Sequence, residues 1–317
     1  MNITSKRVRS PRKANSLKSL SMLALATMGV FCATSPSWAA PLLGSKLASF
    51  TVLGASTVTN VPTSVITGNV GVWSSGGANA ITGFNSSPGV AVSDPQVTGG
   101  NVHAGTVNAM QAQAELTTAI NNLNSLALGS TTLAPADLVG LILAPGVYLV
   151  PAGTTNLSGA LTLNGGGNAN AAWVFLMDST LITSPNSVVN VINTGSGAGV
   201  YWDVRSSATI DVNSTFLGNI LALSSISMNT TATDYCGRAL ASTGAVTLQK
   251  NSLFGVCSGE LAGSNGLSGG LEVTPAGVVS ILPYAPVSNG GTVPEPATLA
   301  LLALGLAGLG FRRRSNG

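Results

Sequence analysis

The sequence predicts an all-β solenoid, a triangular β-helix with one long α-helix packed along a face. Residues 40–255 are rich in small residues, and their short β-type runs are interrupted by Gly, Asn or Ser. Phrases recur in this region at a nearly constant interval, and a single stretch has helical periodicity. Many short strands at close spacing indicate a sandwich, a barrel or a solenoid, and the repeat favours the solenoid.

The repeat is clearest between residues 209 and 252. The phrase TIDVNST at 209–215 is echoed by SMNTTAT at 227–233 and by TLQKNS at 247–252. GNILA at 218–222 returns as GRALA at 237–241, and WVFLM at 173–177 resembles VYWDV at 200–204 with a longer offset. The interval between the echoes accommodates three short strands with tight turns, which is one coil of a triangular β-helix. Coils stack ~4.8 Å apart, so equivalent residues form ladders.

Residues 105–127 break this pattern and predict one amphipathic helix. Their apolar side chains recur every three or four residues, and the others are mostly Gln, Glu, Thr and Asn. A helix of this length would be ~33 Å long and would cover about six or seven coils. We interpret its apolar stripe as a core contact. The stripe consists of Ala112, Leu116, Ile120, Leu123 and Ala127.

Residues 1–39 predict a secretory signal peptide. Six basic residues precede an apolar run over residues 20–33, and Ser37-Trp38-Ala39 supplies the small-x-small pattern that signal peptidase cleaves after. A permanent N-terminal anchor is the alternative, but the apolar run is short for that role. We therefore expect signal peptidase as a processing partner and a mature domain that begins at residue 40.

The C-terminal residues predict a second sorting signal. The motif Val293-Pro294-Glu295-Pro296 leads into an apolar run at 297–311, and three arginines follow at once. A transmembrane helix needs ~20 residues, so we expect only a transient attachment to the inner membrane. The arrangement resembles the PEP-CTERM sorting signal of exopolysaccharide-producing Gram-negative bacteria, whose tail an exosortase processes. It implies a protein that is secreted or held at the cell surface.

The region before this signal is expected to be irregular. We place the solenoid domain at residues 40–257. Residues 258–292 are rich in Gly, Ser and Pro, and we interpret them as a linker with candidate terminal strands at 271–273 and 278–282.

Removing both signals inverts the charge of the chain. The full sequence carries a formal net charge of +3, but nine of its 13 basic residues lie in the two signals. Residues 40–293 keep Lys46, Arg205, Arg238 and Lys250 against nine carboxylates. The resulting net charge of −5 removes the electrostatic basis for nucleic-acid binding.

The mature sequence offers no recognisable catalytic or metal-binding motif. Its one histidine, His103, lies among Gly, Val and Ala and is expected to be a surface or capping residue. Asp203 and Arg205 share strand parity, but the coil alignment places Asp203 beside Leu176, so a surface ion pair is expected rather than a ladder of acids. The sequence thus predicts a non-enzymatic protein without cofactors or metals, and a β-helix polysaccharide lyase ranks last.

The coils instead carry hydroxyl and amide side chains at equivalent positions. When the corner glycines are aligned, Thr63, Asn213 and Thr231 form one rank, and Thr215 and Thr233 form another. Small uncharged side chains on a rigid sheet can order water without ionic hydration, which adsorption to ice requires. Ordinary turn residues of a solenoid are the alternative. The candidate ice-binding residues are Thr63, Thr67, Asn213, Thr215, Thr231, Thr233 and Asn251.

Eight phrases carry a family resemblance. They are LGS at 43–45, FTVL at 50–53, ITGNVGV at 66–72, ITGF at 81–84, LAPGVY at 143–148, WVF at 173–175, GNILA at 218–222 and GRALA at 237–241. Together they resemble the microbial ice-binding protein family with a discontinuous β-helix. The resemblance implies a right-handed β-helix whose first coils come from both ends of the chain, and a second flat face that binds ice. The family's Thr-Ala/Gly-x-Thr/Asn pattern is matched only in its first half, by TATD at 231–234.

Two functions follow as hypotheses. The leading one is a secreted ice-binding protein that adsorbs to ice and inhibits ice growth and recrystallisation. The second, which the sorting signal motivates, is a structural or adhesive protein of the exopolysaccharide matrix without ice affinity. Ice affinity of the mature domain would discriminate between them.

Cys236 and Cys257 predict a disulfide. They are the cysteines that remain when Cys32 leaves with the signal, and their separation in the sequence is close to the coil period. The coil spacing of ~4.8 Å lies within the Cα separation of a disulfide, and secretion supplies an oxidising compartment. We expect the bond to tie the last coil, which would lack a neighbour on one side; two free buried thiols are the alternative.

Overall fold

The structure is a computed structural model that describes residues 39–61, 63–76 and 79–287. The predicted signal peptide, apart from Ala39, and the motif at 293–296 lie outside these residues. In the part of the chain that the structure describes, no helix is both long and apolar enough to cross a membrane. Strands dominate, and the one long helix is α1 (Val107–Asn124). The expected β-rich architecture with a single long helix is therefore confirmed.

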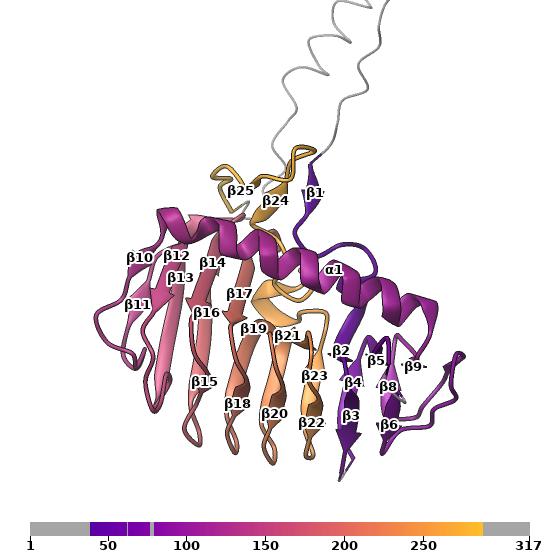
Figure 1. Cartoon of the computed structure of the whole chain (residues 1–317). Coiled ribbons are helices and arrows are strands. Elements are labelled where there is room, and N and C mark those ends of the chain that lie inside the picture. Colours follow the sequence, from indigo (N-terminus) through magenta and orange to yellow (C-terminus); the bar gives the residue numbers. More distant parts are fainter. Residues whose placement is uncertain (1–38, 62, 77–78, 288–317) are drawn as a thin grey trace, which may run out of the picture. The chain divides into compact units, whose positions relative to one another are not determined.

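Most strands lie in three rows of mainly parallel strands, and the chain passes through the rows in turn (Figure 1). We call one such passage a circuit. The first row lies under α1 and is called the helix-covered row. The second consists of strands of two to four residues and is called the short-strand row. The chain then enters the third row, from which β19 and β21 run on directly into the helix-covered row.

The strands are distributed as follows. The helix-covered row contains β10 (Thr131–Thr132), β12 (Gly146–Val150), β14 (Ala172–Met177), β17 (Gly199–Val204), the second halves of β19 (Thr215–Ala222) and β21 (Thr233–Ala241), β2 (Phe50–Gly54), β5 (Asn69–Val72), β9 (Val102–Ala104) and the antiparallel β7 (Ala91–Val92). The short-strand row contains β15 (Leu181–Ile182), β18 (Ala208–Ile210), β20 (Ile226–Met228), β22 (Val246–Leu248), β3 (Thr57–Asn60) and β6 (Ala80–Thr82). The third row contains β11 (Ile142–Leu143), β13 (Ala160–Asn168), β16 (Val188–Thr194), the first halves of β19 and β21, β23 (Ser252–Phe254), β4 (Val65–Thr67) and β8 (Val97–Thr98).

The predicted registers between repeats are confirmed. Thr209 pairs with Ser227, and Ser227 pairs with Thr247, so the three echoed phrases begin in one row. Gly218 pairs with Gly237, which places GNILA beside GRALA. The longer offset is also found, because β14 pairs with β17 and sets Leu176 beside Asp203. The sequence repeat is therefore the period of one circuit.

The order of strands in the rows differs from their order in the chain. β2 follows β21 in the helix-covered row, β3 follows β22 in the short-strand row, and β4 follows β23 in the third row. The N-terminal strands β2, β3 and β4 therefore form the circuit that stacks next to the one ending at Phe254. The expectation that this last circuit has no neighbour on one side was wrong, because β2, β3 and β4 cover its free edge.

The interior between the rows is filled mainly by aliphatic side chains and contains a stack of aromatic rings. The Phe175 and Trp202 rings stack with centroids 4.1 Å apart, and Phe216 lies 5.0 Å from Trp202. The Trp202 indole nitrogen donates to the carbonyl oxygen of Leu217 at 3.1 Å, so the buried polar atom is satisfied. Each aromatic pair contributes about 0.5–1.5 kcal/mol beyond area burial.

Helix α1 begins at a capped end and ends earlier than predicted. The Thr106 hydroxyl accepts a hydrogen bond from the Ala109 backbone nitrogen, which caps the first turn. Ala112, Leu116, Ile120 and Leu123 are buried against the helix-covered row. The fifth predicted stripe residue, Ala127, is exposed because the chain tightens into the 3₁₀ helix η2 (Ser125–Gly129).

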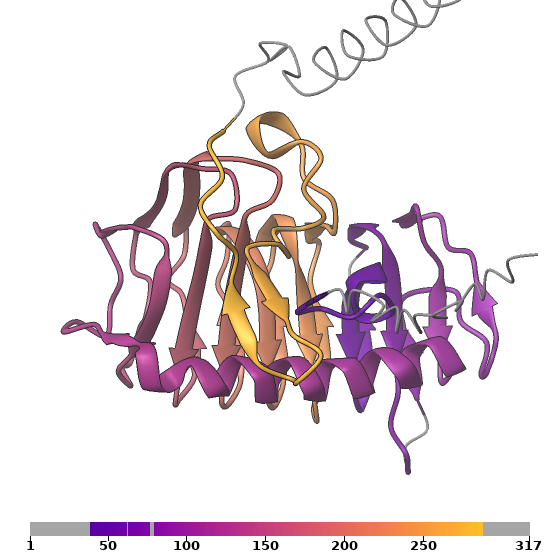
Figure 2. The same ribbon diagram turned by 90° about the horizontal axis from the view of Figure 1, so that it is seen from above.

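Residues 258–287 form part of the fold and are not simply a linker. They contain the short 3₁₀ helix η3 (Gly259–Leu261) and the strands β24 (Leu271–Val273) and β25 (Val279–Ile281). β24 also pairs antiparallel with β1 (Ala40–Pro41), so the first described strand and the last two form one small sheet (Figure 2). A further 3₁₀ helix, η1 (Leu47–Ser49), leads into β2.

Candidate functional site

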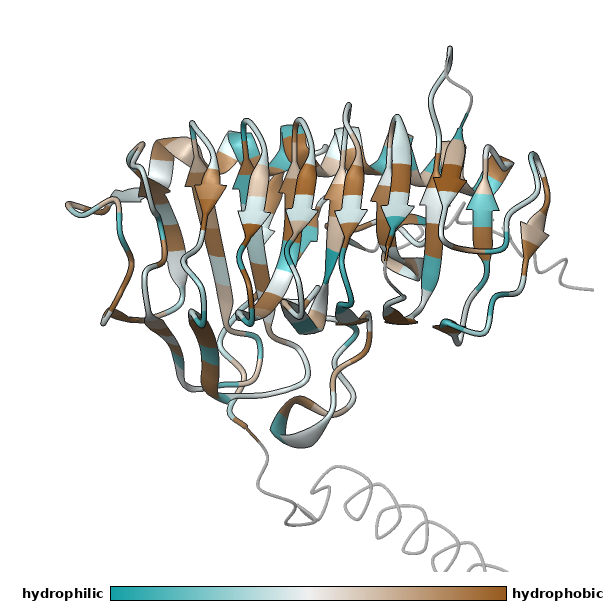
Figure 3. Cartoon of the chain, turned by 90° about the horizontal axis from the view of Figure 1, so that it is seen from below, coloured by the Kyte–Doolittle hydropathy of each residue, from teal (hydrophilic) through white to brown (hydrophobic). Residues whose placement is uncertain are grey.

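The short-strand row presents a regular rank of small side chains. One outward-facing residue of each strand pairs in register from β15 to β6, while the sequence neighbours Ala208, Ile210, Ile226 and Met228 are buried. Seen from below, the short strands lie side by side (Figure 3). The rank consists of Ile182, Thr209, Ser227, Thr247, Thr59 and Thr82.

A second rank lies two residues upstream in each strand. Thr57 pairs with Ala80, and the registers of β18, β20 and β22 place Ser207, Ser225 and Ala245 in line with them. The Ser207 hydroxyl accepts a hydrogen bond from the Ser225 backbone nitrogen at 3.3 Å, which fixes its position. Both ranks are partly or fully exposed.

The surface of these two ranks carries no charged side chain. Arg205 and Asp178 lie before the strands, and Asp211 and Lys250 lie after them, so charges occur only along the edges of the row. β-branched threonines have restricted χ1 rotamers, and the parallel ladder holds their backbone. The row thus presents a regular array of hydroxyl and methyl groups with little conformational freedom.

Three predicted residues lie on the third row instead. Thr215 pairs with Thr233, and the next residues in that rank are Ser252 and Val65. Thr67 lies one rank away, where its hydroxyl is 3.1 Å from that of Thr98. The structure therefore brings Thr215 and Thr233 together, as the repeat predicts, but on a different row from Thr247.

Bulky side chains interrupt the third row. The rank that contains Thr67 also contains Leu217, Tyr235 and Phe254. These three side chains are larger than those of Asn190 and Thr67 on either side of them. Tyr235 is 41% exposed, and its ring lies 5.4 Å from that of Phe254. The hydroxyls of this row are consequently divided by an apolar patch.

Three predicted residues lie at the corner between the short-strand row and the third row. Asn213 and Thr231 have positive φ angles of 56° and 61°, and the Thr231 hydroxyl donates to the Asn213 side-chain oxygen. Lys250, with a φ of 57°, occupies the equivalent corner of the next circuit. Thr63 is exposed, and the pairing of β23 with β4 places it beside Lys250 rather than beside Thr231.

Asn251 is a correction to the predicted site. Its side chain is only 1% exposed, so it cannot contact an external surface. Its amide nitrogen donates to the carbonyl oxygens of Asn229 and Ala232 at 2.8 and 2.9 Å. Because Lys250 has a positive φ, the alternation of inward and outward side chains changes at the corner and turns Asn251 inward.

The expected surface ion pair of Asp203 was wrong. Asp203 is 1% exposed and occupies a position in the helix-covered row between Leu176 and Leu221. Neither of its carboxylate oxygens has a hydrogen-bond partner among the described residues. Burial raises the pKa of Asp203 to about 7, the positive charge of Arg205 lowers it, and the negative charge of Asp178 raises it.

His103 is buried rather than at the surface. Its Nδ1 lies 3.1 Å from the hydroxyl of Thr106, the capping residue of α1, and its ring packs edge-on against Phe50. Burial lowers the pKa of His103. Within residues 39–61, 63–76 and 79–287, no group of three or more His, Cys, Asp or Glu side chains could hold a metal ion.

The structure joins Cys236 and Cys257 in a disulfide, the pair that the spacing singles out. Their Cα atoms lie 4.7 Å apart. The bond connects β21 to the chain just after β23, which is an interior position of the stack. It therefore ties residues 255–258 to the rows rather than a fraying end.

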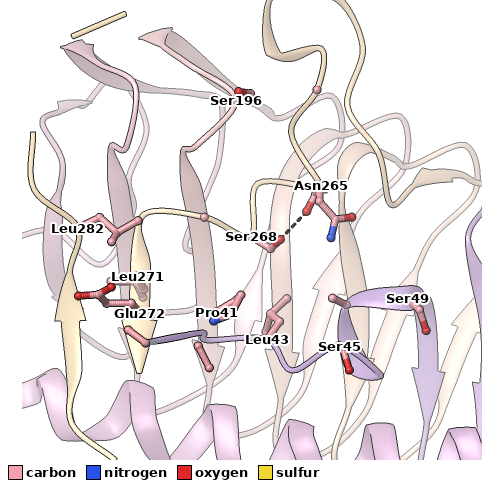
Figure 4. A pocket seen from close by; sticks show the side chains of 15 residues that line it. Pro41, Leu43, Ser45, Ser49, Ser196, Asn265, Ser268, Leu271, Glu272 and Leu282 are labelled. Carbon is pink, nitrogen blue, oxygen red and sulfur yellow. Dashed lines mark hydrogen bonds between the residues drawn. The ribbon is translucent and has the colours of Figure 1, made fainter. Parts of the chain in front are cut away.

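An open pocket of about 840 Å³ lies between β1, β24 and the loop at 263–269 (Figure 4). Its lining is mostly small or apolar, and Glu272 is its one charged side chain among the described residues. The Glu272 carboxylate accepts a hydrogen bond from the Ser280 hydroxyl at 3.2 Å. This lining lacks the convergent nucleophile, base and charge-stabilising groups of an active site.

Comparison with known proteins identifies a family and several relatives. Residues 52–254 match the Ice-binding-like family, and residues 292–314 match the PEP-CTERM protein-sorting motif. An ice-binding protein of Nostoc sp. (strain HG1) is 36% identical over 296 residues, covering 92% of this chain and 94% of that protein. An ice-binding protein of Flammulina populicola is 32% identical over 250 residues, covering 75% of this chain and 98% of that protein.

Solved structures agree with the sequence comparison. The DUF3494 domain of ice-binding protein 1 from Shewanella frigidimarina has a TM-score of 0.59 and 27% identity, covering 68% of this chain and 97% of that one. An ice-binding protein from an Antarctic biological consortium has a TM-score of 0.55 and 31% identity, covering 68% of this chain and 90% of that one. Fold and comparisons define a class of β-rich proteins with one long helix beside the strands. The chain belongs to the Ice-binding-like family.

Proposed function

We propose that this protein is secreted, adsorbs to ice through its short-strand row, and thereby inhibits ice growth and recrystallisation. The observation that carries the proposal is the unbroken register of small, uncharged side chains from Thr209 to Thr82, which Ile182 extends at one end. The names of the relatives support the class of function. The choice of row rests on the geometry alone.

The physical argument concerns water. Neighbouring strands lie ~4.8 Å apart, and residues two positions apart in a strand lie about 6.7 Å apart, so the two ranks form a two-dimensional grid. Hydroxyl groups hold water at the grid points, while methyl groups between them leave that water to bond with its neighbours. The absence of charge within the ranks leaves no ionic hydration shell that would compete with an ice-like arrangement.

We also propose that the three rows are the faces of a right-handed triangular β-helix. The parallel registers and the similar length of the circuits that begin at Thr209, Ser227 and Thr247 support this form. In it, α1 covers one face and the short-strand row is a second face that remains free. The proposed ice-binding domain covers residues 40–257, with residues 258–287 docked on it.

Adsorption requires no chemistry on the ice. Molecules held on the surface force the ice front to curve between them, and curvature lowers the local freezing point. The role is accordingly non-enzymatic and needs no cofactor. The sorting motif at 292–314 supports export and processing by an exosortase. The comparisons do not support the alternative of a matrix protein without ice affinity.

Ice-affinity partition and thermal hysteresis of residues 40–292 test this function. We expect enrichment in the ice fraction, shaped ice crystals and inhibition of recrystallisation. A protein that shows none of these at high micromolar concentration, while its circular dichroism retains β structure, contradicts the proposal. A pull-down with polysaccharide in the absence of ice affinity would instead favour the matrix role.

A further inference from the structure

Both ends of the described chain lie on the same side of the domain. β1, which begins at Ala40, pairs with β24, and the last described residue, Val287, donates its backbone N–H to the Gly167 carbonyl oxygen at 2.9 Å. β1, β24 and β25 lie at the upper side of the molecule, whereas the short strands from β15 to β6 lie at the lower side (Figure 1). The view from above accordingly has β24 and β25 toward the reader, and the view from below has the short-strand row (Figures 2 and 3).

The C-terminal segment is fixed to this upper side by buried side chains. The Tyr201 hydroxyl donates to the Gly269 carbonyl oxygen at 2.8 Å, and the Asn219 amide donates to the Leu267 carbonyl oxygen at 2.8 Å. Arg238 is fully buried, and its guanidinium donates to the Asn265 side-chain oxygen at 2.8 Å. Asn219 and Arg238 are the residues at which the repeated phrases GNILA and GRALA differ most in chemistry.

These contacts lie at the corner between the third row and the helix-covered row. β19 and β21 turn this corner at the paired glycines Gly218 and Gly237. In a three-sided arrangement, this corner is opposite the short-strand row. None of the hydrogen bonds or strand pairs found for residues 258–287 joins them to β15, β18, β20, β22, β3 or β6.

The sorting motif is covalently close to this corner. The match begins at residue 292, five residues after Val287. Five residues span at most about 18 Å when fully extended. The chain therefore continues toward the motif from the upper side of the domain, where Val287 lies.

We infer that a copy held at its C-terminal end presents the short-strand row outward, so that the protein can adhere to a surface and to an ice crystal at the same time. This inference rests on the proposed function and adds adhesion to it. The upper side is the attachment side, and the short-strand row faces outward, free to meet ice. The partner of the attached form is a macroscopic ice surface, and several tethered copies would act together through multivalency.

The test attaches the mature protein to beads from different directions. Residues 40–292 are biotinylated at the C-terminus, at Ser196→Cys, or at Ser227→Cys, and bound to streptavidin beads at equal low density. Ser196 is exposed and lines the pocket on the attachment side, whereas Ser227 lies in the short-strand row. The native cysteines are joined to each other and leave the introduced thiol free for labelling. Bead retention on a slowly growing ice front is counted.

We expect beads attached through the C-terminus or Ser196→Cys to adhere to ice at least about tenfold more than beads attached through Ser227→Cys, a difference of about 1.4 kcal/mol. Free domain that partitions into ice while C-terminally attached beads do not adhere would overturn the inference but leave the proposed function intact. Free domain that fails to partition would overturn the proposed function itself. Equal adhesion from all three positions would contradict the assignment of the outward side to the short-strand row.

Discussion

The short-strand row and the third row are built from the same circuits, yet they present different surfaces. In one circuit Thr247 lies in the first and Ser252 in the second, only a short step apart in the chain. The short-strand row has small side chains on five of its six strands, with Ile182 at the end of the rank, while the middle of the third row is interrupted by Leu217, Tyr235 and Phe254. Both rows satisfy the same backbone pairing, so the fold leaves the outward side chains free to vary. The uniform outward side chains of the short-strand row therefore indicate a function that folding alone does not require.

The largest expected effect comes from giving the short-strand row a bulky residue. Thr247→Tyr would lift the surface from flat ice, and we expect at least about a hundredfold loss of ice affinity, or ~2.7 kcal/mol. Ser252→Tyr adds the same side chain to the third row of the same circuit and should change the affinity less than about twofold, ~0.4 kcal/mol. Ice-affinity partition at matched concentrations measures both. A larger loss in Ser252→Tyr would assign ice binding to the third row.

Reduction of the disulfide should weaken the fold without changing the short-strand row. Cys236 and Cys257 are separated by 21 positions in the sequence, and the chain-entropy estimate for a loop of this size is about 3 kcal/mol. We expect a lower Tm for the double Cys→Ser variant or the reduced protein, with unchanged ice affinity below the transition. Thiol titration of the unfolded, unreduced protein gives no reactive thiol if the bond forms in the secreted protein. Two reactive thiols per chain would contradict the disulfide.

A buried carboxylate in the helix-covered row should make the free energy of unfolding depend on pH, whereas the ranks of the short-strand row contain no group that would do so. Because the folded-state pKa of Asp203 is raised to about 7, the unfolded chain releases this proton at lower pH than the folded one. The free energy of unfolding should therefore fall as pH rises from about 4 to 7, by up to ~1.4 kcal/mol per pH unit from this group. Above pH 7 its contribution is constant.

Asp203→Asn is the matched variant for this dependence. It has nearly the same shape but cannot ionise, so denaturant unfolding between pH 4 and 8 should lose the part of the slope that Asp203 causes. Ice affinity of the folded protein should stay the same in both proteins, because the ranks of the short-strand row contain no carboxylate. An unchanged slope in Asp203→Asn would assign the dependence to another group, such as the buried Asp234, whose pKa burial also raises.

A substitution of Asn251 tests whether this residue stabilises the fold or contacts ice. Asn251→Ala removes two hydrogen bonds to buried carbonyl oxygens and should cost about 1–3 kcal/mol of unfolding free energy. Ice affinity per folded molecule should not change, because the side chain is buried. Chemical denaturation and ice partition, measured on the same preparation, separate the two effects. A loss of ice affinity with an unchanged free energy of unfolding would show that Asn251 contacts ice.

The smallest effect concerns the hydroxyl groups themselves. Thr59→Val keeps the branched shape in the central rank and removes one hydroxyl, so we expect about a twofold loss of ice affinity, ~0.4 kcal/mol. Thr98→Val makes the same change on the third row and should have no measurable effect on affinity. Recrystallisation inhibition over a dilution series resolves twofold differences. Identical behaviour of the two variants would show that shape alone determines adsorption.

The sequence predicted the circuit but not the surface. The echoes that begin at Thr209, Ser227 and Thr247 already mark the central rank of the short-strand row, and their register was correct. The candidate residues were drawn instead from the second half of each echo, since corner glycines aligned Asn213 with Thr231. Thr59 and Thr82 were missed because they join the rank through the pairing of β22 with β3, a contact between residues far apart in the chain.

Burial was the least predictable property. Two-residue alternation ends at each corner where a residue has positive φ, so the inward turn of Asn251 after Lys250 does not follow from strand parity. Asp203 was expected at the surface because a carboxylate is rarely buried without a partner. Its position under α1 depends on how the helix lies across the helix-covered row, which no local pattern encodes. Such residues require the packed structure.

Fluorescence-based ice-plane affinity tests the central claim most directly. The protein is labelled at Ser196→Cys, away from both rows, and incorporated into a single-crystal ice hemisphere. Thr209→Tyr and Thr215→Tyr change neighbouring rows of one circuit. We predict a bound pattern on defined planes for the labelled parent and for Thr215→Tyr, and a dark hemisphere for Thr209→Tyr. A dark hemisphere for Thr215→Tyr with the pattern intact in Thr209→Tyr would contradict the assignment of ice binding to the short-strand row.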